Sequence, residues 1–444
     1  MRIAFISANR EKLPDACIPL GLLYVMAATP ARHDKKLIDL AFVTDSHAYL
    51  AAELIDFEPN LVAVGIRNIQ NNDYSGTSTN IEELKKLLQS IREVTFAPII
   101  LGGAGFSVMP DQLMQVLGAD YGIAGEGEVR FPQFLESLET GGPLPAGIWC
   151  RHNNGPVPMR ELASFMELRA LAPPDRTLLD RAYYKQYGID SVQTSRGCSM
   201  KCTYCTYPLI EGSIRRFFDP TVVADEFARA GEQGADHVFV VDSVFNLPAT
   251  HAKGVCRELI RRENEIPWTC YANPIAFDDE LAELMIQARC IGMEVGSDSG
   301  CNAVLKRLRK GFNVGQIRRL HERAARFGIA DCHTFILGTR GETTEETQRT
   351  LDFIVEMDPF AAIIMVWIDD LEALDTAYAL ERSSARASVL QLLEERRKEF
   401  PHWIIPSLAV NFDETTFRNM RKAGLKGPLW QHMRGQHTSR AKSR

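Results

Sequence analysis

The sequence predicts an α/β protein in which an N-terminal doubly wound sheet precedes a partial (β/α)6 barrel and a small, mainly helical C-terminal region. Two observations predict this class. Apolar runs of strand length alternate with helix-length runs through the first two thirds of the chain, as they do in parallel βαβ units. The 444 residues are also enough for two or three domains.

The first domain is expected over residues 1–145. Strand patterns occur at residues 2–7, 36–40, 61–66, 97–101 and 120–124, and helical patterns at residues 21–29 and 81–94. Ligands of doubly wound sheets bind beyond the carboxyl ends of the strands, where glycines let a bulky group approach the backbone. Gly-rich loops follow two of these strands, at residues 101–107 and 124–128. The pattern therefore favours a ligand-binding domain.

Residues 146–188 are expected to be a linker, and the barrel is expected over residues 189–370. Its six strand patterns lie at residues 191–194, 237–241, 268–272, 291–295, 330–336 and 361–367. Chemistry in such barrels takes place on the loops at the carboxyl ends of the strands. Residues 371–444 are expected to form a cap region, with a helix at 376–400, and a basic tail.

Composition excludes several classes of protein. The net charge of −7 gives no basic field that would favour nucleic acid or an acidic membrane surface. No apolar run approaches the roughly 20 residues that span a bilayer, and we expect a cytoplasmic protein without a secretory leader. The ten cysteines of this long chain do not form a disulfide framework, because only three of them cluster.

Those three cysteines, Cys198, Cys202 and Cys205, form a C-x₃-C-x₂-C cluster on one short loop. Three thiolates at this spacing can converge on one inorganic centre. Structural zinc sites are closed by four ligands, and ordinary [4Fe–4S] clusters take four cysteines. A three-cysteine loop leaves one metal position open for another molecule; a zinc site is the alternative.

The spacing, with its glycine and aromatic neighbours, resembles the signature loop of the radical S-adenosylmethionine (SAM) enzymes. The resemblance implies that the three cysteines hold a [4Fe–4S] cluster whose open iron binds the amino and carboxylate groups of SAM. It further implies that the cluster passes an electron to the sulfonium of SAM.

The same resemblance implies cofactor contacts at later strand ends. Residues 292–298 resemble the family's G-x-E-S-G-S-D stretch, with Val295 in place of a serine, and residues 337–343 resemble L-G-x-P-G-E-T, with Arg340 in place of proline. The implied SAM-binding residues are Tyr204, Asp242, Ser243, Glu294, Gly338 and Arg340. The alternatives are a packing aromatic for Tyr204, a helix N-cap for Asp242 and Ser243, a buried salt bridge for Glu294 and a solvated turn for Arg340.

Residues 1–140 resemble the Rossmann-like cobalamin-binding domain that precedes the radical domain in one large subfamily. The matching landmarks include Pro19, Gly21, Gly102, Gly103, Gly125 and Glu126. Many cobalamin proteins carry D-x-H-x-x-G, but residues 45–50 lack its glycine, so we interpret His47 as a helix-start residue. Arg67 and Asn68 resemble an R-N-x-x-N stretch that faces the lower side of the corrin ring; a salt-bridged surface loop is the alternative.

The resemblance implies a methyltransferase that acts on an unactivated carbon of a small-molecule substrate. A 5′-deoxyadenosyl radical would take a hydrogen from the substrate, and methylcobalamin would supply the methyl group. An external electron donor of the flavodoxin or ferredoxin type is expected. Asp369, Asp370 and Glu372 are candidates for an acidic substrate wall, or for an acidic first helical turn. The alternatives are a radical reaction without methyl transfer and a non-enzymatic cofactor carrier.

Overall fold

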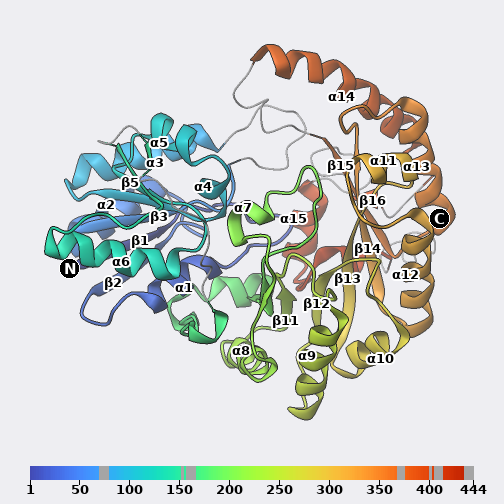
Figure 1. Cartoon of the computed structure of the whole chain (residues 1–444), viewed down its shortest axis with the longest axis horizontal. Helices are drawn as coiled ribbons and strands as arrows, with labels where there is room; N and C mark the ends of the chain where they lie inside the picture. Colours follow the sequence, from blue (N-terminus) through green and yellow to red (C-terminus); the bar gives the residue numbers. More distant parts are fainter. Residues whose placement is uncertain are drawn as a thin grey trace.

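The computed structural model of the chain describes residues 1–69, 80–151, 155–156, 167–367, 376–399, 403–404 and 414–434. It contains two seven-stranded sheets and a two-stranded ribbon. The first sheet and its helices form one body, and the second sheet and its helices form the other (Figure 1). The arrangement confirms the predicted α/β class, with a doubly wound sheet followed by a partial barrel.

The N-terminal sheet has the strand order β2-β1-β3-β4-β5-β6-β7. Its strands are β1 (Arg2–Ser7), β2 (Asp34–Asp39), β3 (Leu61–Gly65), β4 (Ile99–Gly102), β5 (Tyr121–Ile123), β6 (Ile148–Cys150) and β7 (Gly155–Pro156). Strands β1 to β5 are parallel, and β6 and β7 continue the sheet antiparallel. The strand order reverses between β1 and β3, and ligands of such sheets bind at this reversal, beyond the strands' carboxyl ends.

Six helices accompany this sheet. They are α1 (Leu20–Ala28), α2 (Ser46–Phe57), α3 (Ile81–Val94), α4 (Ala104–Val108), α5 (Pro110–Leu117) and α6 (Gly127–Thr140). Helix α3 has the bounds that its sequence predicts, because its buried leucines and isoleucine recur at helical spacing while Glu82 and Glu83 occupy the first turn.

The second sheet has the order β16-β15-β14-β13-β12-β11-β8, and its strands are parallel. They are β8 (Ile189–Val192), β11 (His237–Val240), β12 (Trp268–Ala272), β13 (Cys290–Asp298), β14 (Ala330–Leu337), β15 (Ala361–Val366) and β16 (Trp403–Ile404). The strand predicted at 191–194 begins earlier, at Ile189, because the buried charge of Asp190 interrupts the apolar pattern. Strand β16 adds a seventh strand to the six that the sequence predicts.

Helices follow the barrel strands along the chain. They are α8 (Pro220–Glu232), α9 (Ala249–Arg261), α10 (Asp279–Gln287), α11 (Asn302–Arg307), α12 (Val314–Phe327), α13 (Thr344–Met357) and α14 (Thr376–Arg396). The ribbon of β9 (Ser195–Arg196) and β10 (Arg216–Phe217) and the short helix α7 (Tyr207–Glu211) flank the cysteine loop. No helix of the described residues is long and apolar enough to cross a membrane.

The C-terminal segment 414–434 packs into the barrel. It contains α15 (Glu414–Lys422) and the 3₁₀ turn Leu429–His432. Trp430 is 4% exposed and shares a core cluster with Cys332 of β14 and Ala361 of β15. Trp430 therefore packs in the core beside the barrel strands.

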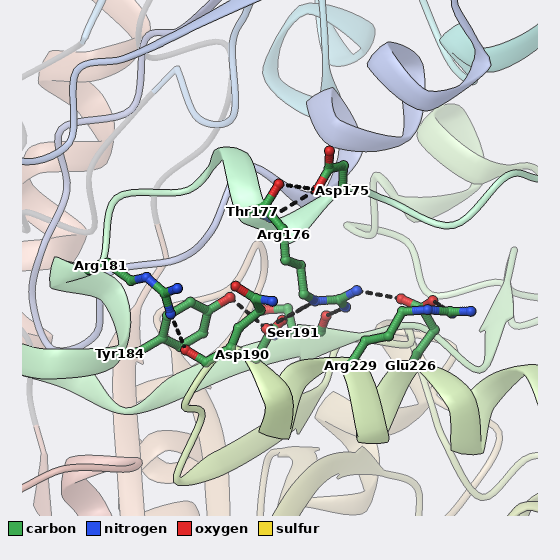
Figure 2. A network of polar contacts seen from close by, with 10 residues as sticks. Asp175, Arg176, Thr177, Arg181, Tyr184, Asp190, Ser191, Glu226 and Arg229 are labelled. Atoms are coloured by element: carbon green, nitrogen blue, oxygen red, sulfur yellow. Dashed lines mark hydrogen bonds and ion pairs between the residues drawn. The ribbon is translucent and has the colours of Figure 1, made fainter.

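A buried charge network joins residues 167–188 to the barrel. Arg176 lies on the 3₁₀ turn Arg176–Leu178 and reaches between β8 and α8 (Figure 2). Its Nε donates to both oxygens of Asp190, at 3.1 and 3.0 Å, and its Nη1 donates to Glu226 at 2.5 Å. Tyr184 donates a further hydrogen bond to Asp190, at 2.8 Å. The domain limits at 145 and 188 remain predictions, but this segment is firmly attached to the barrel.

Replacing Arg176 with methionine should destabilise the barrel, because Asp190 would stay buried without a counter-charge and Glu226 would keep only the exposed Arg229. Breaking a buried ion pair in this way costs about 3–5 kcal/mol. The matched control is Arg229→Met, since Arg229 also pairs with Glu226 but is 41% exposed; exposed pairs contribute about 1 kcal/mol or less. Denaturant midpoints followed by circular dichroism test this, and equal shifts for both variants would contradict it.

Candidate functional site

The cysteine loop begins at the carboxyl end of β8, where Asp242 fixes its start. Asp242 is fully buried, and its carboxylate accepts hydrogen bonds from the amide and hydroxyl groups of both Thr194 and Ser195, at 2.5–3.0 Å. It is not a helix N-cap, because the following helix begins at Ala249. With four hydrogen bonds inside the protein, this carboxylate holds the loop, and its expected contact with SAM remains a prediction.

Gly197 and Ser243 hold the next part of the loop. Gly197 has φ +82°, and a Cβ at this position would lie 2.2 Å from the carbonyl oxygen of Ile214, so only glycine fits. Ser243 donates to the carbonyl oxygen of Gly197 at 3.1 Å. The amide of Cys198 donates to the carbonyl oxygen of Gly212, also at 3.1 Å. The backbone that presents the first cysteine is therefore fixed from three sides.

The three thiols lie close enough together to influence one another. Cys198 is 6% exposed, and Cys202 and Cys205 are half-buried. Burial raises the pKa of Cys202 and Cys205, and the neighbouring cysteines raise it further, while the ammonium of Lys310 opposes both effects. Thiolates in such surroundings are favoured when a metal centre neutralises their charge. The residues present thus fit a cationic iron–sulfur centre.

Tyr204 forms a buried polar cluster beside this loop. Its hydroxyl donates to Asp298 at 2.6 Å, and the ammonium of Lys310 lies 2.8 Å from the same carboxylate and 3.1 Å from the tyrosine oxygen. The ring of Tyr204 meets Trp367 edge-on, with centroids 5.8 Å apart. Sequence reasoning missed Lys310, whose only signal was its place among charged residues after α11. The expected adenine contact of Tyr204 is not tested by these contacts.

Glu294 lies on β13, and its partner is an indole rather than a basic side chain. Trp430 Nε1 donates to Glu294 Oε1 at 2.9 Å. Glu294 is half-buried, and desolvation by the surrounding protein raises its pKa to about 7, although the hydrogen bond from Trp430 opposes this rise. Among the described residues the contact of Glu294 is this hydrogen bond rather than a salt bridge. A ribose contact by its remaining oxygen stays a prediction.

The turn that contains Gly338 and Arg340 is held by Glu342. The carboxylate of Glu342 accepts from the amide and hydroxyl of Thr339, at 2.9 and 2.7 Å, and from Thr347 at 3.1 Å. Gly338 has φ +73°, and its carbonyl oxygen accepts from Arg382 at 2.6 Å. Arg340 is exposed, as a solvated turn residue would be.

Two glycines leave open surface at the ligand edge of the N-terminal sheet. Gly21 is exposed at the start of α1, one residue after Leu20 and two after Pro19, and a Cβ there would meet nothing within 4 Å. At Gly102, which ends β4, the nearest atom would be 3.7 Å away. Gly103 differs, because a Cβ would lie 2.5 Å from the carbonyl oxygen of Ile66. The open positions fit the approach of a bulky ligand such as a corrin ring.

Glu126 connects the two bodies of the protein. Arg196, which lies two residues before Cys198, pairs with Glu126 at 3.2 Å and with Glu128 at 2.8 Å, and all three side chains are at most 8% exposed. Arg216 pairs with Glu126 at 2.8 Å. Gly125, with φ +75°, begins this acidic turn. The sequence places Glu126 among the cobalamin-domain landmarks, but its carboxylate is used to dock the cysteine loop; a cobalamin contact remains a prediction.

Arg67 and His47 lie in different surroundings. His47 is the second residue of α2, where the side chain of Asp45 accepts from the amide of Ala48, so the helix-start interpretation is confirmed. Its Nδ1 is 2.6 Å from Ser90 Oγ. Arg67 and Asn68 are exposed just beyond β3, and no salt bridge of Arg67 occurs among the described residues. The described residues thus show an exposed loop, and the role of Arg67 stays a prediction.

Arg67, at the end of the N-terminal sheet, acts electrostatically on two tyrosines of the other body. Burial raises the pKa of Tyr207 and Tyr271, and the charge of Arg67 opposes this rise in both. Tyr271 keeps 37% of its surface accessible. Helix α4, which follows Gly103, contacts α7, which follows Cys205 by two residues (Figure 1). The structure thus brings the ligand edge of the sheet to the cysteine loop.

Of the predicted site residues, Asp369, Asp370 and Glu372 lie outside the described residues. Sequence reasoning also missed Arg196 as part of the site. The signal for Arg196 was its fixed place in the Ser195-Arg-Gly-Cys198 run.

Comparison with known proteins identifies both the N-terminal domain and the barrel. The model of the radical SAM superfamily matches residues 192–354, and the model of the B12 binding domain matches residues 6–135. A tryptophan 2-C-methyltransferase of Streptomyces laurentii is 26% identical over 425 residues, which cover 80% of this chain and 70% of the relative. A cytidylyl-2-hydroxyethylphosphonate methyltransferase of Streptomyces wedmorensis is 24% identical, over 78% of this chain and 75% of its own.

Among solved structures, the fold matches the radical SAM methyltransferase TsrM of Kitasatospora setae, solved with cobalamin and a [4Fe–4S] cluster bound. The TM-score is 0.73 and the identity 24%, over 82% of this chain and 72% of TsrM. This protein is therefore a cobalamin-binding radical SAM enzyme whose cofactors are a [4Fe–4S] cluster, S-adenosylmethionine and cobalamin, and it is similar to proteins that are named as methyltransferases.

Proposed function

We propose that this enzyme transfers a methyl group to an unactivated carbon of a small-molecule substrate. The observation that carries the proposal is the docking of the cysteine loop onto the N-terminal sheet. Arg196 pairs with Glu126 and Glu128, and α4 contacts α7, so a molecule on the sheet edge and one on the cysteine loop would share one space. Methyl transfer from one cofactor to a carbon activated by another needs such proximity.

In this proposal Cys198, Cys202 and Cys205 bind the cluster, and SAM lies against Tyr204, Ser243 and Glu294. When bound, the cluster and SAM supply a 5′-deoxyadenosyl radical and cobalamin supplies the methyl group. The protein holds the loop through Asp242 and Gly197. The two bodies are also held together by an apolar core that is continuous from Phe5 through Tyr24 to Phe218.

The proposal includes a polar small-molecule substrate and an external electron donor. The relatives named above act on tryptophan and on a phosphonate nucleotide, and TsrM has also been solved with tryptophan and a SAM analogue. A polar small molecule that approaches Tyr271 from the space between the two bodies agrees with these names. Asp369, Asp370 and Glu372 are proposed to face its polar groups, and a flavodoxin- or ferredoxin-type protein is proposed to reduce the cluster.

The hydrogen bond from Trp430 to Glu294 should set the pH dependence of SAM cleavage. A carboxylate that binds ribose must be ionised, so activity should rise with pH through the pKa of Glu294, about 7. Trp430→Phe removes the donor, which destabilises the ionised form and raises this pKa. The rising limb of the pH profile of 5′-deoxyadenosine formation should therefore move to higher pH, and Glu294→Gln should abolish the limb. An unmoved profile in Trp430→Phe would contradict the assignment.

Cobalt should have no histidine ligand on its lower face. The protein purified with cobalamin should give a cob(II)alamin electron paramagnetic resonance spectrum without nitrogen splitting, and His47→Ala should leave the spectrum unchanged, because His47 lies on α2 beside Ser90. Arg67→Ala should change the spectrum or lower corrinoid retention, since Arg67 lies at the end of the N-terminal sheet and acts electrostatically on two tyrosines of the other body. A nitrogen splitting that disappears in His47→Ala would contradict this prediction.

The products test the reaction itself. With SAM labelled on its methyl group, the substrate should gain the label, and 5′-deoxyadenosine and S-adenosylhomocysteine should form in about equal amounts, because the radical step and the methyl-loading step each consume one SAM. Mass spectrometry measures all three. The variant with Cys198, Cys202 and Cys205 changed to alanine should form no 5′-deoxyadenosine. Deoxyadenosine formed with substrate but without S-adenosylhomocysteine would favour a radical reaction that transfers no methyl group; absence of both would favour a carrier.

A further inference from the structure

Three potential metal ligands converge on the outer side of the barrel, away from the cysteine loop. Asp331 and His333 are the second and fourth residues of β14, so they lie on the same face of the strand. His321 lies on α12, which contacts β14. The cysteine loop is at the carboxyl ends of the strands, whereas these residues are near the amino end of β14. The cluster is therefore separate from the site described above.

The three ligand atoms are close to one another. His321 Nδ1 is 2.6 Å and His333 Nε2 is 2.9 Å from the same atom, Asp331 Oδ2. All three atoms lie within 4.8 Å of one another, and the two imidazole centroids are 6.3 Å apart. Tetrahedral Zn²⁺ with bonds of about 2.0–2.2 Å separates its ligand atoms by roughly 3.3 Å. An opening of about half an ångström would admit the ion.

Outer contacts hold the ligands without using the converging atoms. His333 Nδ1 is 2.7 Å from the hydroxyl of Ser297, and the amide of Phe360 donates to Asp331 Oδ1 at 3.0 Å. Metal-binding histidines are usually oriented through their second nitrogen in this way. The serine hydroxyl can donate or accept, so His333 can move its proton to Nδ1 and free Nε2 for a metal.

The charge and burial of the cluster also suit a cation. Burial would raise the pKa of Asp331, but the hydrogen bonds from His321 and His333 outweigh it and hold the pKa well below its usual value. Asp331 and His333 are buried, while the side chain of His321 is 19% exposed. This opening gives an ion a route in and leaves room for a water ligand.

We propose that His321, Asp331 and His333 bind one Zn²⁺ ion, with water as the fourth ligand, and that the ion fastens α12 to β14 at the base of the barrel. Two imidazole nitrogens and one carboxylate oxygen form a ligand set that zinc accepts. The ion carries no part of the methyl-transfer chemistry, so the proposal stands independently of the proposed function.

The competing explanation is a hydrogen-bonded cluster in which Asp331 accepts from two histidines and no metal binds. Isosteric substitutions separate the two. His321→Asn keeps an N–H donor near the position of Nδ1, and His333→Gln keeps one near Nε2, so both variants preserve hydrogen bonds to Asp331 but lose a metal ligand. Ser297→Ala removes only the orienting contact.

The experiment uses the full-length, cluster-reconstituted protein freed of loosely held divalent metal, with Zn²⁺ alone or Co²⁺ alone as the probe. We expect one tightly bound Zn²⁺ per chain by mass spectrometric metal analysis, a rise in the midpoint of thermal unfolding and tetrahedral Co²⁺ absorption bands. Each isosteric variant should weaken Zn²⁺ binding at least about 100-fold, and Ser297→Ala about 10- to 100-fold. His47→Asn, a matched change outside the cluster, should have no effect.

Either of two outcomes would overturn the proposal. One is a wild-type protein that binds no more zinc than the His321→Asn and His333→Gln variants, which would leave a hydrogen-bonded cluster. The other is stoichiometric zinc that persists in both variants and disappears when the three loop cysteines are changed to alanine, which would place the ion at the cysteine loop.

Discussion

The ion pairs of Arg196 join the two bodies of the protein and fix the position of the cysteine loop. Its guanidinium is buried between Glu126 and Glu128 of the N-terminal body, and its backbone continues within two residues to Cys198. The planar ring of Tyr24 lies 5.1 Å from the same guanidinium. Buried charges of this kind are costly unless fully paired, so the two bodies cannot separate without exposing or stranding three charges. The interaction fixes where the cysteine loop lies relative to the sheet edge.

The fold was largely readable from the sequence, because its elements are long and periodic. Helix α3 and strand β12 have the predicted bounds. The sequence predicts that β8 starts at residue 191, which is two residues too late. The reason is that Asp190 is a buried charge whose partner, Arg176, precedes it by 14 residues. In the sequence, a charged residue that is paired inside the protein cannot be distinguished from a polar residue that ends an apolar strand.

The site was less readable, because polar residues there have partners far along the chain. Asp242 and Glu126 both suggest ligand contacts from their places at strand ends. The partners that occupy them, Thr194 and Arg196, are separated from them by 48 and 70 residues. No local pattern pairs such residues; only the topology does. The position of the cysteine loop could be predicted because three cysteines within eight residues specify it locally.

The segment 414–434 has a consequence for the order in which the protein is made. Arg421 binds Asp15 and the carbonyl oxygen of Pro14 in the loop after β1, and Trp430 reaches Glu294. The ribosome makes this segment after every strand of the barrel. Domains tend to fold from the N-terminus as they emerge, so both bodies can form before these contacts exist. The interior of the barrel is therefore completed late in synthesis, and a protein made only as far as β15 lacks the residue that holds Glu294.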